Sequence, residues 1–160
     1  MSKQGDGRMT MAEWAASVLS AADDPMWRLE EHGYQPALEH DTETRFAIGN
    51  GFLGVRGSLE QPTVASRPRT FIAGLFDHSA GEPALPALAC GPDWLRINLL
   101  VDNQPLSLES GETLAHGRTL DFPRGVLIGE WRQHMPAGQI VRQRTLRFAS
   151  LAAPAENATL

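Results

Sequence analysis

Apolar and polar positions change along this chain from a helical spacing to a strand spacing near residue 40. Apolar residues recur at three- and four-residue intervals over 10–24, which predicts one short amphipathic helix there. Thr10 can cap its N-terminus, with Glu13 in the capping-box position. Pro25 cannot continue a helix and restricts the residue before it, so the helix should end there. The polar residues 1–9 are expected to be disordered.

Beyond residue 40, short runs rich in β-branched and aromatic residues alternate with turn signals, which indicates strands. The predicted strands span residues 45–48, 52–56, 70–76, 94–101, 126–134 and 140–148. No helical pattern separates these runs, so we predict an all-β fold, an antiparallel β-sandwich with one N-terminal helix. The last two runs do not alternate cleanly between apolar and polar residues, so each of their faces should be partly buried.

Turn residues locate the connections between these strands. Asp102-Asn103 predicts one tight turn, and Gly138 lies in a second turn that joins the last two strands. The longest stretch without predicted structure is 79–93, and we expect its Cys90 to lie in a loop.

A glycine-rich stretch, AIGNGFLGVRGS, needs its own explanation. Residues 49–54 have the Gly-x-Gly-x-x-Gly spacing of a dinucleotide-binding loop. The following segment contains Gly57 and Pro62 and offers no helix whose N-terminus could face a pyrophosphate, which excludes that interpretation. We therefore predict a hairpin with a type I′ turn at Asn50-Gly51, and expect the other glycines to mark bulges or close backbone approaches.

Composition and charge limit the partners. The chain has 160 residues and a net charge of -5, which argues against a nucleic-acid partner. No apolar run approaches the ~18 residues of a membrane-spanning helix, so no membrane partner is expected. Cys90 is the single cysteine, which excludes an internal disulfide and suits a reducing cytoplasm, the expected location.

Candidate chemistry is sparse. The histidine spacing fits no metal site, and no cofactor motif is present, so we expect neither a metal nor a cofactor. On a strand, Glu39, Asp41 and Glu43 would share one face, and two convergent carboxylates would suit glycoside chemistry. Solvated or loop-capping acids are the favoured alternative. The arginines of the last quarter form either a solvated sheet face, which is favoured, or an anion or sugar site.

Four motifs together resemble one family. The runs ETRFAIGNGFLGVRGSLEQ, FIAGLFD, PDWLRINLLVDNQPLSL and RTLDFPRGVLIGEWRQH are similar, in order and spacing, to the N-terminal domain of glycoside hydrolase family 65. The similarity extends over about residues 27–151. It implies a large β-sandwich, of the galactose-mutarotase-like supersandwich type, followed by a helical linker, an (α/α)6 catalytic barrel and a small C-terminal sheet. We accordingly expect residues 25–151 to form an incomplete sandwich and 152–160 a tail.

The resemblance also implies a function. Family members are phosphorylases of maltose, trehalose, kojibiose or nigerose, or hydrolases of α-glucosides. Their general acid and phosphate-binding residues lie in the barrel, so no residue of this chain is carried over as catalytic. The resemblance implies a non-catalytic domain that supports its own catalytic barrel and helps a homo-oligomer to form. The whole enzyme would act on an α-glucosyl disaccharide, with inorganic phosphate as co-substrate in a phosphorylase.

Residues at the rim of a carbohydrate site are the remaining candidates. These are Asn50, Arg56, Asp77 and Trp94, although a sheet salt bridge is the favoured role for Arg56. A second hypothesis is a stand-alone carbohydrate-binding module that stacks sugar rings on Trp27, Trp94 or Trp131. A third is a purely structural oligomerisation domain. A sandwich that lacks its later strands would leave sheet edges uncovered, which would favour self-association of the chain.

Overall fold

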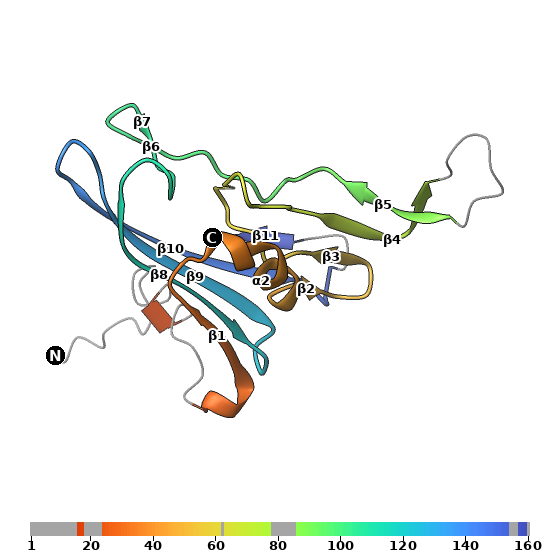
Figure 1. Cartoon of the computed structure of the whole chain (residues 1–160). Coiled ribbons are helices and arrows are strands. Elements are labelled where there is room, and N and C mark those ends of the chain that lie inside the picture. Colours follow the sequence, from red (N-terminus) through yellow and green to blue (C-terminus); the bar gives the residue numbers. More distant parts are fainter. Residues whose placement is uncertain (1–15, 18–23, 62, 78–85, 154–156, 160) are drawn as a thin grey trace, which may run out of the picture.

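The computed structural model describes residues 16–17, 24–61, 63–77, 86–153 and 157–159, which form layered antiparallel sheets (Figure 1). The strands are β1 (Arg28–His32), β2 (Ile48–Gly49), β3 (Leu53–Val55), β4 (Thr70–Asp77), β5 (Ala87–Gly91), β6 (Leu100–Val101), β7 (Gln104–Pro105), β8 (Glu112–Asp121), β9 (Val126–His134), β10 (Ile140–Ala149) and β11 (Asn157–Thr159). The helices are the 3-10 turns η1 (Pro25–Trp27) and η2 (Pro36–Leu38) and the α-helix α2 (Glu39–Arg45). The predicted antiparallel, β-rich fold is therefore confirmed.

Three sheets are present among the described residues. The largest, sheet A, has the strand order β1-β8-β9-β10-β11, and sheet B has the order β2-β3-β4-β5. Strands β6 and β7 form a separate hairpin. Each pairing in sheets A and B is antiparallel, which short connections between consecutive strands allow.

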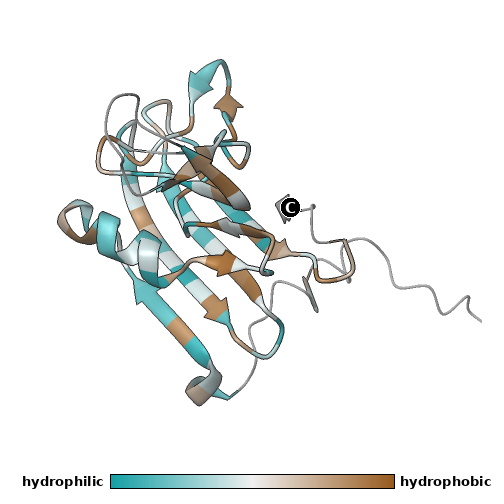
Figure 2. Ribbon diagram, turned by 90° about the vertical axis from the view of Figure 1, so that its right-hand side faces the viewer, coloured by the Kyte–Doolittle hydropathy of each residue, from teal (hydrophilic) through white to brown (hydrophobic). Residues whose placement is uncertain are grey.

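The inner face of sheet A is covered by α2 and by the extended segment 57–61, which run between the two large sheets (Figure 1). Hydrophilic and hydrophobic bands alternate along the strands of sheet A (Figure 2), as expected where successive side chains point to opposite faces. One apolar cluster joins Phe46 to Leu120 and Leu127 beneath α2. Leu59 of the covering segment anchors a second cluster, against Trp131 and its neighbours. Charged and polar residues occupy the space between the two clusters.

The hairpin predicted at the glycine-rich stretch is present, but the type I′ turn predicted for Asn50-Gly51 is not. Strands β2 and β3 pair Gly49 with Gly54, and φ is positive at Gly51 (87°) but not at Asn50. The Asn50 side chain explains the difference, because its Oδ1 accepts hydrogen bonds from the backbone N–H groups of Phe52 (3.0 Å) and Leu53 (2.8 Å). An asparagine that caps the turn in this way has no need of a left-handed backbone.

The type I′ pattern is found instead in the β6–β7 hairpin. Asp102 and Asn103 both have positive φ, 48° and 62°, as both central residues of that turn require. The predicted turn between β9 and β10 is also confirmed, with Gly138 at φ 96° and its N–H bonded to the carbonyl of Met135 at 2.9 Å.

Four of the six predicted strands are confirmed in place, and two are wrong. The confirmed predictions are 52–56, 70–76, 126–134 and 140–148, which contain or match β3, β4, β9 and β10. The segment 45–48 instead contains the end of α2 and the start of β2. In 94–101 only Leu100–Val101 is a strand.

Five strands were not predicted. They are β1, β5, β7, β8 and β11. Cys90 lies in β5 opposite Phe71 and is exposed, so its predicted loop position is wrong. β8 escapes prediction because His116 and Arg118 occupy two of its inward positions, where an alternating pattern would place apolar residues.

The predicted N-terminal helix lies mostly outside the described residues. Ala16 and Ser17 are helical, and residues 1–15 and 18–23 are not described. The predicted end of that helix therefore also lies outside the described residues. Pro25 opens η1, whose cap is the Asp24 side chain, bonded to the N–H of Met26 at 2.9 Å. Within the expected tail, Asn157–Thr159 form β11 against the end of β10.

A glycine at the turn from β3 into the covering segment should be required for packing. A Cβ on Gly57 would lie 2.5 Å from the Cβ and 2.6 Å from the carbonyl oxygen of Phe46. We expect Gly57→Ala to lower the free energy of unfolding by about 1–3 kcal/mol, the usual cost of overpacking, measured by urea denaturation. Gly54→Ala is the matched control, because a Cβ there meets no atom within 4 Å. Equal stabilities for the two variants would contradict this prediction.

Candidate functional site: a buried ionic layer

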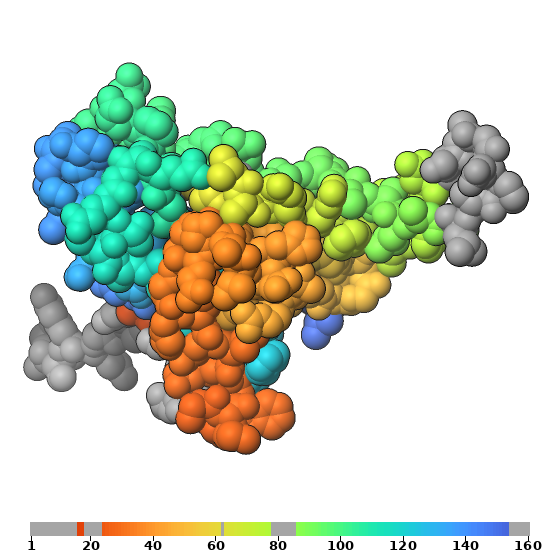
Figure 3. Space-filling view, viewed as in Figure 1, coloured from red at the N-terminus to blue at the C-terminus, as the bar shows by residue number. Residues whose placement is uncertain are grey.

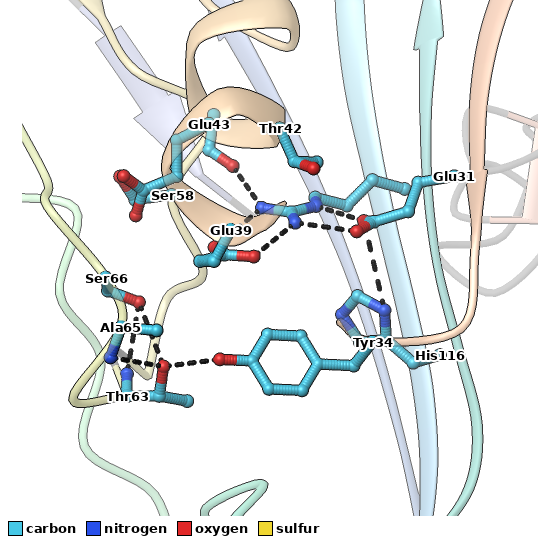
Figure 4. A network of polar contacts seen from close by, with 12 residues as sticks. Glu31, Tyr34, Glu39, Thr42, Glu43, Ser58, Thr63, Ala65, Ser66 and His116 are labelled. Atoms are coloured by element: carbon cyan, nitrogen blue, oxygen red, sulfur yellow. Dashed lines mark hydrogen bonds and ion pairs between the residues drawn. The ribbon is translucent and has the colours of Figure 1, made fainter. Parts of the chain in front are cut away.

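Arg118 of β8 lies at the centre of the polar layer between the sheets. Its Nε donates to Glu31 at 2.5 Å, and its Nη2 donates to Glu31 at 3.0 Å and to Glu39 at 2.7 Å. Its Nη1 donates to Glu39 at 3.1 Å and to the carbonyl of Gly57 at 2.8 Å. All five guanidinium N–H groups are therefore used, in a side chain that is 2% exposed. Figure 4 shows Glu31 and Glu39 on two sides of one guanidinium group.

The helix α2 supplies two of the buried acids. Glu39 and Glu43 are four residues apart, so they share one helix face, and both are fully buried. Glu43 accepts the backbone N–H of Arg67 at 3.0 Å on each carboxylate oxygen. The expectation that Glu39, Asp41 and Glu43 share a strand face is therefore wrong, because the segment is a helix and Asp41 points to solvent.

A second buried ion pair involves Arg147 of β10, which is separated from β8 by β9. Glu60 of the covering segment accepts hydrogen bonds from Arg147 Nε at 2.9 Å and from Thr145 Oγ1 at 2.7 Å. Arg147 also donates to the carbonyl of Ser58. Gly129 on β9 leaves room for this arrangement, because a Cβ there would lie 2.7 Å from Thr145 Oγ1. Arg118, through the carbonyl of Gly57, and Arg147, through Glu60, thus connect sheet A to the same covering segment.

An aromatic pair closes one side of the layer. The rings of Tyr34 and His116 meet edge to face with centroids 5.6 Å apart, and the Tyr34 hydroxyl is 2.6 Å from Thr63 Oγ1. Burial raises the pKa of Tyr34. Burial also lowers the pKa of His116, although the nearby Glu31 carboxylate acts in the opposite direction. The lowered pKa favours a neutral imidazole.

Burial and pairing oppose each other at the two carboxylates. Burial outweighs the hydrogen bonds and charge of Arg118, so the pKa of Glu39 is raised. Burial also acts against the charge on Glu60, but Arg147 and Thr145 outweigh it and lower the pKa of Glu60. Burial alone would lower the pKa of Arg118, whereas its bonds to Glu31 and Glu39 raise it. The layer therefore holds two acids with opposite pH responses.

The cavity in this layer is too small for a sugar. It has a volume of about 20 Å³ and lies between the inner faces of β8, β9 and β10 and the covering segment. Such a volume accommodates a water molecule, whereas pockets for small-molecule ligands measure about 300–1,000 Å³. The buried ionic layer therefore acts in the architecture of the domain.

The four residues predicted at a carbohydrate rim lie on separate elements. Asn50 Nδ2 donates to the carbonyl of Ser150 at 2.6 Å, which fastens the β2–β3 turn to the chain beyond β10. Asp77 ends β4, and Trp94 follows β5 and is 47% exposed. Arg56 follows β3 and its side chain contacts α2.

Arg56 serves to hold α2 in place. Its Nη2 donates to Thr44 Oγ1 at 2.6 Å and to the carbonyl of His40, and lies 3.6 Å from the Glu43 carboxylate. These contacts agree with the salt-bridge role favoured for this residue. Of the proposed sugar platforms, Trp131 is a core residue only 5% exposed, whereas Trp27 is 58% exposed.

The arginines near the C-terminal end divide between the layer and the surface. Arg147 is buried with Glu60, whereas Arg142 and Arg144 pair with the partly exposed Glu130, at 2.6 Å and 3.2 Å. These surface pairs agree with a solvated sheet face. Sequence reasoning missed Arg118, because its partners are distant in the chain; the only local signal was charge at alternate positions in a run that could form a strand.

Metal and membrane features can be assessed only for the described part of the chain. Within it, no group of three or more His, Cys, Asp or Glu residues is placed to hold a metal ion. No helix in the same residues has the length and apolar character needed to cross a bilayer.

Fold and site together define a β-rich domain that is organised by buried ion pairs around a cavity too small for a sugar. Residues 29–158 match the family described as Glycosyl hydrolase family 65, N-terminal domain. The chain belongs to this family, and the resemblance seen in the sequence motifs is confirmed.

Curated relatives include phosphorylases. The chain is 30% identical over 127 residues to kojibiose phosphorylase of Caldanaerobacter subterraneus subsp. tengcongensis, and 33% identical over 127 residues to that of Halothermothrix orenii. Each match covers 79% of this chain and 16% of the relative. An uncharacterized glycosyl hydrolase of Mycobacterium tuberculosis is 32% identical over 140 residues, which are 82% of this chain and 10% of that protein.

A solved structure from the human microbiome, assigned provisionally as a kojibiose phosphorylase, has the same fold. It superposes with a TM-score of 0.70 at 14% identity and covers 79% of this chain and 18% of that one. This chain thus spans about one sixth of the length of the curated phosphorylases that it matches.

Removal of the central cation should uncover the cost of its two buried partners. We expect Arg118→Met to lower the free energy of unfolding by about 3–5 kcal/mol, because Glu31 and Glu39 would remain buried without a counter-charge. Arg142→Met is the control, since its pair with Glu130 is 57% and 40% exposed and should contribute less than about 1 kcal/mol. Chemical denaturation of both variants measures the difference. A comparable loss in the control would refute the special role of Arg118.

The two acids should give stability profiles of opposite slope. The folded pKa of Glu39 lies above its unfolded value, so its contribution to stability is present below the unfolded pKa and is lost as pH rises through the folded pKa. The folded pKa of Glu60 lies below its unfolded value, so its contribution is lost as pH falls through the folded pKa.

The wild-type chain should therefore lose stability relative to Glu39→Gln as pH rises above the unfolded glutamate pKa. Relative to Glu60→Gln it should lose stability as pH falls below that value. Unfolding free energies measured at intervals from about pH 3 to pH 7 test both slopes. Parallel profiles for the two variants would show that the two pKa shifts do not differ in sign.

Proposed function

We propose that this chain serves as the non-catalytic N-terminal β-sandwich of a longer carbohydrate-active enzyme that acts on α-glucosyl disaccharides. The observation that carries the proposal is the family match over residues 29–158, in a chain that aligns to only 16% of each of two kojibiose phosphorylases. A domain of this kind would support the catalytic barrel that the family resemblance implies.

The engagement of the buried acids supports a non-catalytic role. Glycoside cleavage uses two carboxyl groups that flank the scissile bond, one of them free to give up a proton. Glu31 and Glu39 are instead bonded to Arg118, and Glu60 is bonded to Arg147. Glu39 and Glu60 are in addition closed off from solvent, at 0% and 7% exposed.

The chemistry of the longer enzyme follows from the family resemblance. Inorganic phosphate would attack the anomeric carbon while a glutamic acid of the barrel protonates the leaving oxygen, giving β-glucose 1-phosphate with inversion. Hydrolysis is the close variant, in which water replaces phosphate and a second carboxylate acts as the base. The same proposal includes a homo-oligomeric enzyme and a cytoplasmic location, which a lone exposed Cys90 favours.

A carbohydrate-binding module is the second candidate, because Trp27 and Trp94 are 58% and 47% exposed and could each stack on a sugar ring. Titration of the chain with maltose or trehalose, followed by tryptophan fluorescence, separates the two candidates. A saturable change that disappears in Trp94→Ala or Trp27→Ala would favour the module. Fluorescence that does not respond would favour the supporting domain.

Activity provides the direct test. The 160-residue chain, incubated with maltose, trehalose or kojibiose and phosphate, should release neither glucose 1-phosphate nor glucose. The full-length protein that carries it should release one of them. Turnover by the 160-residue chain alone would mean that its own carboxylates form a catalytic site. It would overturn the proposal that this domain is non-catalytic.

A further inference from the structure

The outer half of the β4–β5 hairpin projects from the body of the domain (Figures 1 and 3). β3 pairs only with the first three residues of β4, Thr70 to Ile72. Beyond them the register shifts and Gly74 has φ 79°, after which Phe76 and Asp77 pair only with β5. We name residues 74–77 and 87–89 the arm.

The arm exposes apolar side chains on both of its faces. Leu75 is 42% exposed and Phe76 is 52% exposed, and because they are consecutive in a strand they point to opposite faces. Leu88 lies opposite Phe76 and is 43% exposed. An isolated two-stranded hairpin is only marginally stable in water, and exposed clusters of large apolar residues mark interaction sites. The arm therefore requires a cover that the described residues of this chain do not provide.

The two-sided exposure limits what the cover can be. Pairing of a second copy along the edge of β5 would satisfy backbone groups but would leave both faces of the arm in water. Stacking on a flat surface would cover one face. A groove that receives the arm covers both faces at once.

A groove on a second copy of this domain fits poorly. Two hollows on its described surface contain acidic and basic side chains, Glu31 with Arg144 in one and Asp41 with Arg45 in the other. The arm offers these charges no counterpart beyond Asp77, its one charged described residue. The family relatives, by contrast, carry far more chain than this, since the match covers 16% of their length.

We propose that the arm inserts into an apolar groove on the remainder of the longer family 65 protein and thereby fixes this domain to it. This inference rests on the proposed function. Its chemistry is the burial of Leu75, Phe76 and Leu88 from both faces, so the groove should be lined by apolar side chains on two walls.

Hydrogen exchange followed by mass spectrometry tests the proposal in the full-length protein and in the 160-residue chain. The amides of the arm should exchange at least about tenfold more slowly in the full-length protein, whereas those at the centre of β9 should exchange alike in both. Phe76→Ser should abolish the protection of the arm. Ile140→Ser, which alters another exposed apolar residue (63%) on β10, should leave the protection of the arm unchanged.

Each alternative outcome has a separate meaning. Equal exchange of the arm in both proteins would overturn the inference, even if the full-length protein cleaves disaccharides. Protection that appears in the 160-residue chain alone and grows with its concentration would also overturn it, and would identify a second copy as the partner. The arm could also be protected in a full-length protein that shows neither phosphorolysis nor hydrolysis. That result would uphold the inference and contradict the proposed function.

Discussion

The position of Arg118 between two buried carboxylates is the constraint on which the remaining structure depends. Its guanidinium joins four parts of the chain: its own strand β8, Glu31 on β1, Glu39 on α2 and the carbonyl of Gly57. Burial of a cation is costly, and it is tolerated here because each N–H donor has an acceptor. The same saturation fixes geometry, because a planar fork that binds two carboxylates cannot shift without loss of several bonds together.

The Glu60–Arg147 pair, two strands further along sheet A, is a second buried ion pair, so the space between the sheets is partly ionic and only partly apolar. A core of this kind contributes alignment of the layers more than net stability, since buried pairs offset much of their own desolvation. It also has a functional consequence. Carboxylates that are held by arginines in a nearly closed layer are unsuited to bind and cleave a sugar, which supports the proposed non-catalytic role.

The arm has the opposite character. Inside the domain, buried arginines and carboxylates pair across the layers, whereas Leu75, Phe76 and Leu88 lie in water on a hairpin held by a single strand pairing. A domain that pairs its buried charges internally but leaves large apolar side chains exposed is suited to be one part of a larger assembly. The match to about one sixth of the length of curated phosphorylases accords with that character.

The sequence by itself determined the strands β9 and β10, the turns at Asp102-Asn103 and Gly138, the β-rich fold and the family, because these depend on local residue patterns and on motif order. Only the tertiary structure decided that Glu39 and Glu43 lie on a helix, that β8 is a strand, and that Asn50 fastens its turn to the chain beyond β10. The physical reason is distance along the chain. Arg118 meets Glu39 from 79 residues away and Glu31 from 87, so the charges that obscure the strand pattern of β8 are neutralised by partners that no local pattern can reveal.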